Sequence, residues 1–313
     1  MSGAQAVRHG PGAAAGLTLS QRETRAAWTM MSPAILLAVT FLVVPFALAI
    51  GLSFTNQRLV PNPNAPTDIV WFTNYLRILG DGDFLQSFWN TLVFAAVIVP
   101  LQSAFALAVA LLLNSALPLR NLFRGIYFLP TVLSMVVVSV VWFSLYQHDG
   151  FFNTALGAVT FGAVEPVDWL RDPDLALPAI ILLSMWQGFG FQMVIYLAGL
   201  QQINAALYEA ARVDGATRWQ EFRHITLPCL RNTHIVVMVT TTILAFKLFS
   251  QVELLTQGGP RGATNTVVRY IYQSGFSEGR VGRAAAASVV FFVAVLLIAL
   301  VQRWLVREER EIR

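Results

Sequence analysis

Six long apolar segments dominate this sequence and restrict the folds that it can adopt. They cover residues 28–54, 85–114, 122–146, 175–200, 233–256 and 284–306. About 20 apolar residues in a helix cross the roughly 30 Å of hydrocarbon in a bilayer, and a helix satisfies its backbone hydrogen bonds internally. The sequence therefore predicts an all-α, polytopic membrane protein with six transmembrane helices.

The composition favours the same fold class. Of the 313 residues, 56% are hydrophobic and only 12% are charged, and the mean hydropathy is +0.61. Soluble domains usually have roughly 25% charged residues. We expect an N-terminal tail at 1–27, a six-span domain at 28–306 and a C-terminal tail at 307–313. Cleavage of the first segment as a signal peptide is the weaker alternative, because its apolar run exceeds the roughly 15 residues of a signal core.

The distribution of arginines predicts the orientation. With both termini inside, the inner segments hold thirteen arginines and seven acidic residues, whereas the outer loops hold seven arginines and nine acidic residues. Basic residues concentrate on the cytoplasmic side of membrane proteins, so we expect both termini in the cytoplasm. The 257–283 loop disagrees, because it places four arginines outside. We interpret the acidic 148–174 loop as solvated, with a docking surface as the alternative.

Residue usage excludes several kinds of site from this chain. Lys247 is the only lysine and follows no Gly-rich turn, so a phosphate-binding P-loop is absent and ATP would have to bind another subunit. Cys229 is the only cysteine, which excludes an internal disulfide and a cysteine-built metal site. His148, His224 and His234 lack metal-ligand spacing. We expect no catalytic residue, no metal site and no nucleic-acid partner.

The segment between the fourth and fifth spans, residues 204–228, predicts a small helix–Gly–helix knob. Asn204 can cap a short helix that contains Ala210 and Ala211, and Gly215 supplies the left-handed residue that ends it. Pro228 then begins the next span. Such a knob suits insertion into a cleft on a partner, although an ordinary interfacial loop would have the same composition.

The spacing within this segment resembles the cytoplasmic loop of permease subunits in ATP-binding-cassette (ABC) importers. Glu209-Ala210-Ala211, Gly215 and the Ile-x-Leu-Pro at 225–228 stand at that family's positions. The resemblance implies that Glu209, Ala210, Ala211, Asp214 and Gly215 form a coupling helix that docks on an ATPase subunit. It implies a bacterial inner membrane, two copies of the ATPase that bind ATP and Mg²⁺, and no cofactor in this chain.

A second set of segments resembles the carbohydrate branch of this family, the maltose, trehalose and glycerol-phosphate type. These segments are Leu254–Pro260 with its Gly258-Gly259-Pro260 turn, Ala263–Thr266, Ile271–Gln273 and Ala284–Ala287. The resemblance is to the first of two unlike permeases. It implies a second unlike permease, an extracytoplasmic solute-binding protein and alternating access. A disaccharide such as trehalose or maltose is the first expectation for the solute, and glycerol 3-phosphate is the alternative.

Polar residues inside the spans are the candidates for the solute pathway, because they are costly in hydrocarbon. By resemblance to maltose-type permeases we nominate Gln187, Gly188, Phe191, Lys247, Ser250 and Gln251. Gly188 and Gly190 are expected to loosen the fourth span and open space. The alternative is that the amides join helices and that Lys247 pairs with a neighbouring subunit. Many relatives carry an acidic residue where Ser250 stands.

Two other classes of protein compete with the importer. Residues 80–83 match a Gly-x-Gly-Asp motif of intramembrane aspartyl proteases, but no Tyr-Asp partner lies in any span. An ion-driven secondary transporter would need a conducting site of its own and no ATPase partner. We expect neither.

Overall fold

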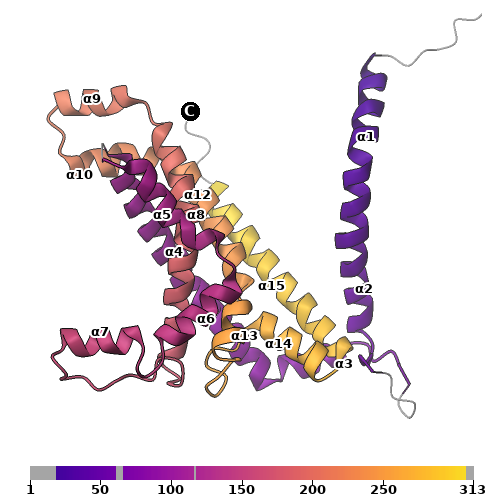
Figure 1. Ribbon diagram of the computed structural model, residues 1–313. Coiled ribbons are helices and arrows are strands. Elements are labelled where there is room, and N and C mark those ends of the chain that lie inside the picture. The colour runs from indigo at the N-terminus through magenta and orange to yellow at the C-terminus, as the bar shows by residue number, and fades with distance from the viewer. Residues whose placement is uncertain (1–18, 61–65, 116–117, 308–313) are drawn as a thin grey trace, which may run out of the picture. The chain divides into compact units, whose positions relative to one another are not determined.

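The computed structural model describes residues 19–60, 66–115 and 118–307. Within these ranges the chain is built from helices and contains no β-strand. It divides into two compact units, Met1–Gly51 and Leu52–Arg313 (Figure 1).

The first unit contains one long helix. α1 (Leu19–Ala38) continues through a π-helical turn (Val39–Val43) into α2 (Val44–Ser53). Its stretch Glu23–Ser53 is long and apolar enough to cross a membrane, as predicted for the first span. The helix begins at Leu19, inside the expected tail, because residues 19–27 contain neither Gly nor Pro and can extend a helix beyond its apolar part. Residues 1–18 of the expected tail lie outside the described residues, as do 308–313.

Three long helices of the second unit match the second, fourth and sixth predicted spans. They are α4 (Gly82–Asn114), α8 (Ala176–Gln201) and α15 (Val281–Arg307). Each contains a stretch that can cross a membrane. α4 and α8 pack against each other along much of their length, and α12 packs against both.

The third predicted span is bent, contrary to the expectation of a continuous helix, because α5 (Arg120–Val132) and α6 (Met135–Leu145) meet at 96°. A second bend, of 67°, lies between residues 218–229 and α12 (Arg231–Phe246), just before the fifth predicted span. The fifth span is also interrupted, because α12 ends before Lys247 and α13 (Ser250–Leu255) resumes after it. The described residues therefore provide four long helices, or six crossings if each bent pair is one span.

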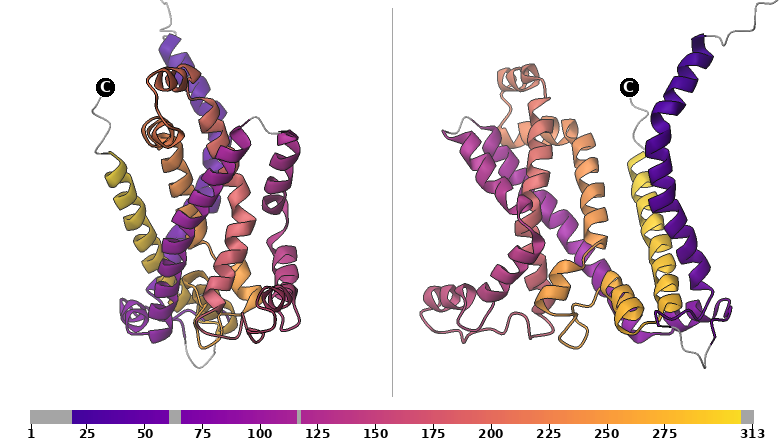
Figure 2. Two further views of the ribbon diagram at one scale, coloured as in Figure 1. Left: turned by 90° about the vertical axis from the view of Figure 1, so that its left-hand side faces the viewer. Right: turned by 45° about the vertical axis from the view of Figure 1, so that its right-hand side comes forward.

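Short helices lie at the two ends of the second unit (Figures 1 and 2). One end, here called the knob end, carries α9 (Ala205–Val213) and α10 (Arg218–Glu221), followed by a π-helical turn (Phe222–Thr226) and α11 (Leu227–Cys229). The opposite end, here called the far end, carries α3 (Thr73–Leu79), α7 (Phe151–Val159), α13, α14 (Val267–Tyr272) and a π-helical turn (Gln273–Ser277).

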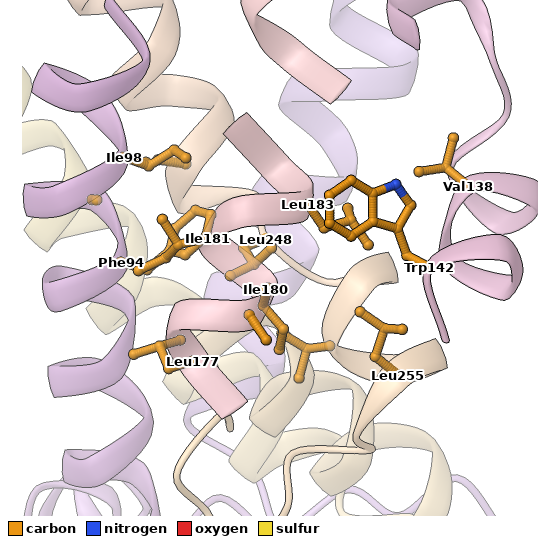
Figure 3. Close-up of a cluster of buried hydrophobic side chains, with 14 of the residues drawn as sticks. Phe94, Ile98, Val138, Trp142, Leu177, Ile180, Ile181, Leu183, Leu248 and Leu255 are labelled. Atoms are coloured by element: carbon orange, nitrogen blue, oxygen red, sulfur yellow. The ribbon is translucent and has the colours of Figure 1, made fainter. Parts of the chain in front are cut away.

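Apolar side chains fill the spaces between the helices of the second unit. The largest cluster joins α4, α6, α8 and α13, where Trp142 and Leu183 lie among branched aliphatic side chains (Figure 3). A second cluster joins α4, α8 and α12 nearer the knob end and surrounds the buried Tyr196. At the far end, α15 packs closely because Ala286 and Ala287 are fully buried.

A polar cluster joins three helices at the far end. The guanidinium of Arg283 forms an ion pair with the carboxylate of Asp81, and the Tyr270 hydroxyl donates to the same carboxylate at 2.7 Å. Burial raises the pKa of Asp81, but hydrogen bonds from Tyr270 and the Asp83 amide, together with the charge of Arg283, hold that pKa below its ordinary value. The cluster therefore stabilises the junction of α4, α14 and α15 with Asp81 ionised.

Replacing Asp81 with Asn should lower the free energy of unfolding by about 2 kcal/mol, because Arg283 would lose its anion in a largely buried site. Asn retains an oxygen for the Asp83 amide, so the helix cap remains. The control is Arg280→Gln, which breaks an exposed ion pair with Glu278. It should change the free energy of unfolding by no more than about 1 kcal/mol. Thermal unfolding in detergent measures both variants, and equal midpoints would contradict the assignment.

Candidate functional site

A cavity of about 270 Å³, here called the central cavity, lies between α4, α6, α8 and the interruption between α12 and α13. Its polar lining consists of amides, hydroxyls and one ammonium group, contributed by Gln102, Ser184, Gln187, Gln192, Thr241, Lys247, Ser250 and Gln251. Leu244, Leu248 and other apolar side chains complete the wall. The lining can donate and accept several hydrogen bonds and holds one positive charge.

Five of the six residues predicted for the solute pathway line this cavity: Gln187, Gly188, Lys247, Ser250 and Gln251. Phe191, the sixth, is not part of this lining and has a side chain that is 41% exposed, so its place in the pathway stays a prediction. Phe191 lies one helical turn beyond Gln187 in α8, toward the knob end.

Lys247 occupies the position at which α12 ends. The partial negative charge at a helix C-terminus favours a cation there. Among the described residues, its ammonium group forms no hydrogen bond and no ion pair, and its side chain is exposed. Lys247 and Ser250 lie on opposite sides of the interruption between α12 and α13, and both line the cavity.

The interruption is supported from the far end. The hydroxyl of Thr266 donates to the carbonyl oxygen of Leu248 at 2.9 Å, so a backbone acceptor freed by the interruption has a partner. Such compensation is needed within a membrane, where an unpaired backbone group costs several kcal/mol.

Four polar residues of the lining were missed by sequence reasoning: Gln102, Ser184, Gln192 and Thr241. Gln192 donates to Thr241 at 2.5 Å and so joins α8 to α12, as the alternative interpretation of the amides foresaw. Gln251 donates to Ser184 at 3.4 Å. The sequence did contain a signal for these four residues, because each is a polar residue within an apolar segment, where polar side chains are costly.

The glycines of α8 do not loosen the helix, contrary to expectation. α8 is a continuous helix through both. A Cβ atom on Gly188 would meet the amide nitrogen of Gln102 in α4, and one on Gly190 would meet the carbonyl oxygen of Tyr127 in α5. The absence of side chains therefore allows two neighbouring helices to approach α8 closely.

Gly190→Ala should destabilise the protein more than Gly188→Ala, by roughly 1–3 kcal/mol, because overpacking costs this much where neighbours cannot yield. The neighbour of Gly190 is backbone, whereas that of Gly188 is the end of a flexible side chain. Thermal unfolding of the two matched variants measures the difference. A larger loss for Gly188→Ala would show that α5 moves more readily than Gln102.

The turn predicted at Gly258-Gly259-Pro260 is present at the far end. Gly258 has a φ of +81°, and a Cβ atom there would lie 2.6 Å from a guanidinium nitrogen of Arg269, so glycine is required. Arg269 also forms an ion pair with Glu253 at 2.9 Å. Glu253, in α13, is therefore paired.

The knob predicted between the fourth and fifth spans is confirmed as a helix–Gly–helix unit (Figure 1). The side chain of Asn204 caps α9 by accepting from the Ala206 amide at 3.0 Å, and Gly215 has a φ of +80°. Arg212 pairs with Glu221 at 2.9 Å and holds α9 against α10. Pro228 lies in α11 before the bend and does not begin the fifth span.

The predicted coupling residues lie on the surface of this knob. Glu209, Ala210, Asp214 and Gly215 are exposed, and Ala211 is half-buried. A hollow of about 330 Å³ lies between the two helices and is lined in part by Ala211, Asp214 and Gly215. Two large apolar side chains of the knob, Val213 and Trp219, are also exposed, at 87% and 65%.

Comparison with known proteins agrees with these features. Residues 84–311 match the family model described as "Binding-protein-dependent transport system inner membrane component". The lactose transport system permease protein LacF of Rhizobium radiobacter is 34% identical over 288 residues, which are 90% of this chain and 94% of that protein. The trehalose/maltose transport system permease protein MalF of Thermococcus litoralis is 33% identical over 284 residues, again 90% and 94%.

A chain of a bacterial ABC transporter that imports the acidic polysaccharide alginate has a similar structure. The TM-score is 0.79 at 27% sequence identity, over 93% of this chain and 98% of that one. A second alginate transporter structure, in complex with its pentasaccharide-bound periplasmic protein, gives a TM-score of 0.80 at 26% identity. The match covers 93% of this chain and 96% of that one. With its membrane helices and matched length, this chain belongs to the family of inner membrane components of binding-protein-dependent transport systems.

Proposed function

We propose that this chain is the permease subunit of an ABC importer for a small saccharide and that the central cavity forms one half of the solute pathway. One observation carries this proposal. α8 lines the central cavity and leads through Gln202–Asn204 into the knob, and the chain returns from the knob into α12, which ends at the cavity with Lys247. The knob is thus flanked by two helices that line the cavity.

This connection supports a mechanical role for the knob. Closure of a partner ATPase on ATP and Mg²⁺ would displace the knob, and α8 and α12 would carry the displacement to the cavity as rigid bodies. The second, unlike permease would supply the other half of the pathway, two ATPase copies would bind at the knob end, and the binding protein would deliver solute to the far end. The arginine distribution supports a cytoplasmic knob end and cytoplasmic termini in a bacterial inner membrane.

Glu209→Lys and Gly215→Pro should each abolish co-purification of the ATPase and ATP-dependent uptake in proteoliposomes. Proline cannot adopt the positive φ of Gly215, and the lysine reverses a charge on the exposed surface of α9. Gly162→Pro is the matched control, because Gly162 has a φ of +78° and, like Gly215, no neighbouring atom within 4 Å of its Cβ position. Uptake that continues without ATP would favour an ion-driven transporter instead.

A disaccharide such as trehalose or maltose is our first proposal for the solute. The amides and hydroxyls of the central cavity can bind sugar hydroxyls, and relatives are named for lactose and for trehalose/maltose transport. An anionic solute such as glycerol 3-phosphate is the second candidate, because Lys247 is the only charged residue in the lining and has no anion among the described residues.

Four substitutions separate these candidates in uptake assays with the assembled importer. For trehalose or maltose, Lys247→Gln should reduce uptake less than Gln251→Leu does. For glycerol 3-phosphate, Lys247→Gln should reduce uptake at least about tenfold, since a hydrogen bond to a charged group is worth about 1.5–3 kcal/mol. Ser250→Asp should also reduce glycerol 3-phosphate uptake, because the new carboxylate would pair with Lys247. Lys247→Arg keeps the positive charge and should retain this uptake.

A further inference from the structure

A second cavity, here called the far-end cavity, has a volume of about 360 Å³ and shares no lining residue with the central cavity. Three segments surround it: the end of α6 with the residues after it, the segment before α8, and the end of α13 with the Gly259-Pro260 turn. Its volume is in the range of small-molecule sites, about 300–1,000 Å³. Sequence reasoning did not assign this region to the solute.

The walls of the far-end cavity are fixed by side chains outside it. The buried amide of Asn153 donates to the carbonyl oxygens of Gln147 and His148 at 3.3 and 3.1 Å, and it accepts from the indole nitrogen of Trp169 at 3.0 Å. Asn153 therefore holds two walls together. On the third wall, the hydroxyl of Thr264 donates to the Gly259 carbonyl at 2.6 Å. Such support is what a binding site needs if its lining is to be organised before the ligand arrives.

Aromatic rings form part of the lining, and their polar atoms are already bonded within the protein. The hydroxyl of Tyr146 donates to the carbonyl oxygen of Ala179 at 2.8 Å, and the indole nitrogen of Trp169 is held by Asn153. The two ring centroids are 6.1 Å apart. Tyr146 is only 3% exposed and stacks on Phe152, so it backs the half-buried Trp169, whose ring surface is the one on which the weakly positive C–H groups of a sugar ring can pack.

The polar rim carries charges of both signs. Asp168 and Arg171 line the cavity, and both are exposed. Within the part of the chain that the structure describes, the carboxylate of Asp168 and the guanidinium of Arg171 form no hydrogen bond or ion pair. A carboxylate accepts hydroxyl protons and a guanidinium donates to hydroxyl oxygens, so the two suit a group that carries several hydroxyls and no net charge.

The two cavities lie along the same helices. α6 contributes Met135 to the central cavity and Phe143 to the far-end cavity, and α13 contributes Gln251 to the first and Leu255 to the second. Buried apolar side chains occupy the intervening stretches of both helices, among them Trp142 of α6 (Figure 3). A solute that moved along α6 and α13 would meet the far-end cavity first if it came from the far end.

We propose that the far-end cavity is a saccharide subsite, in which one sugar ring packs on the ring of Trp169 and is bonded by the charged rim of Asp168 and Arg171. This inference rests on the proposed function, because it takes the solute to be a saccharide that enters from the far end. It adds a binding site that precedes the central cavity and is separated from it by an apolar layer.

The test measures saccharide binding to the assembled importer in lipid nanodiscs without its binding protein. Maltose, trehalose and lactose are titrated and followed by saturation-transfer-difference NMR. Asp168→Asn and Arg171→Gln should each weaken binding about tenfold, the loss expected for a hydrogen bond to a charged group. Glu165→Gln and Asp174→Asn are controls from the same loop that do not line the cavity, and they should bind like the wild type.

Three other outcomes would overturn the subsite. If Gln251→Leu weakens saccharide binding but Asp168→Asn and Arg171→Gln do not, the subsite is wrong and the proposed function stands. If the rim variants leave saccharide binding intact but weaken docking of the sugar-free binding protein, the cavity receives that protein instead. If no saccharide of the panel binds the wild type, the subsite and the proposed saccharide specificity both fail.

Discussion

The interruption of the fifth span is the feature on which the central cavity depends. A continuous helix from Arg231 to Leu255 would have paired its own backbone groups. Instead α12 stops at Phe246, and the Leu248 carbonyl receives its hydrogen bond from Thr266, which lies beyond the Gly258-Gly259-Pro260 turn. Thr266 also directly precedes α14, whose Tyr270 takes part in the polar cluster of Asp81 and Arg283. The lining of the central cavity is therefore bonded to the far end of the protein.

The positions and order of the apolar helices could be predicted from the sequence, because a helix needs about 20 apolar residues to cross the hydrocarbon. Among the described residues, four helices reach this length, or six spans do if each bent pair is counted as one. The bend at Leu133 and the interruption at Lys247 could not be predicted in this way. The group that compensates the interruption, Thr266, is 18 residues away from its partner Leu248. For the same reason, nothing local indicated that Glu253 pairs with Arg269.

The candidate site was predicted in part. Gln187, Lys247, Ser250 and Gln251, nominated by resemblance among polar residues that are costly in a span, line the central cavity. Phe191 is not polar and so gives no such signal in the sequence, and the direction in which its side chain points depends on how α8 packs. The glycines were misinterpreted because a missing side chain is compatible both with open space and with a close neighbour. Only the positions of Gln102 and Tyr127 decide between the two.

The amino-acid composition of the central cavity has a practical consequence. Lys247 is the only lysine in the sequence and its side chain is exposed. Amine-reactive reagents would therefore modify a single side chain of this subunit, inside the proposed pathway. The chain thus carries a natural chemical reporter, whose rate of labelling by reagents of different size would follow the opening and closing of the central cavity without any engineered residue.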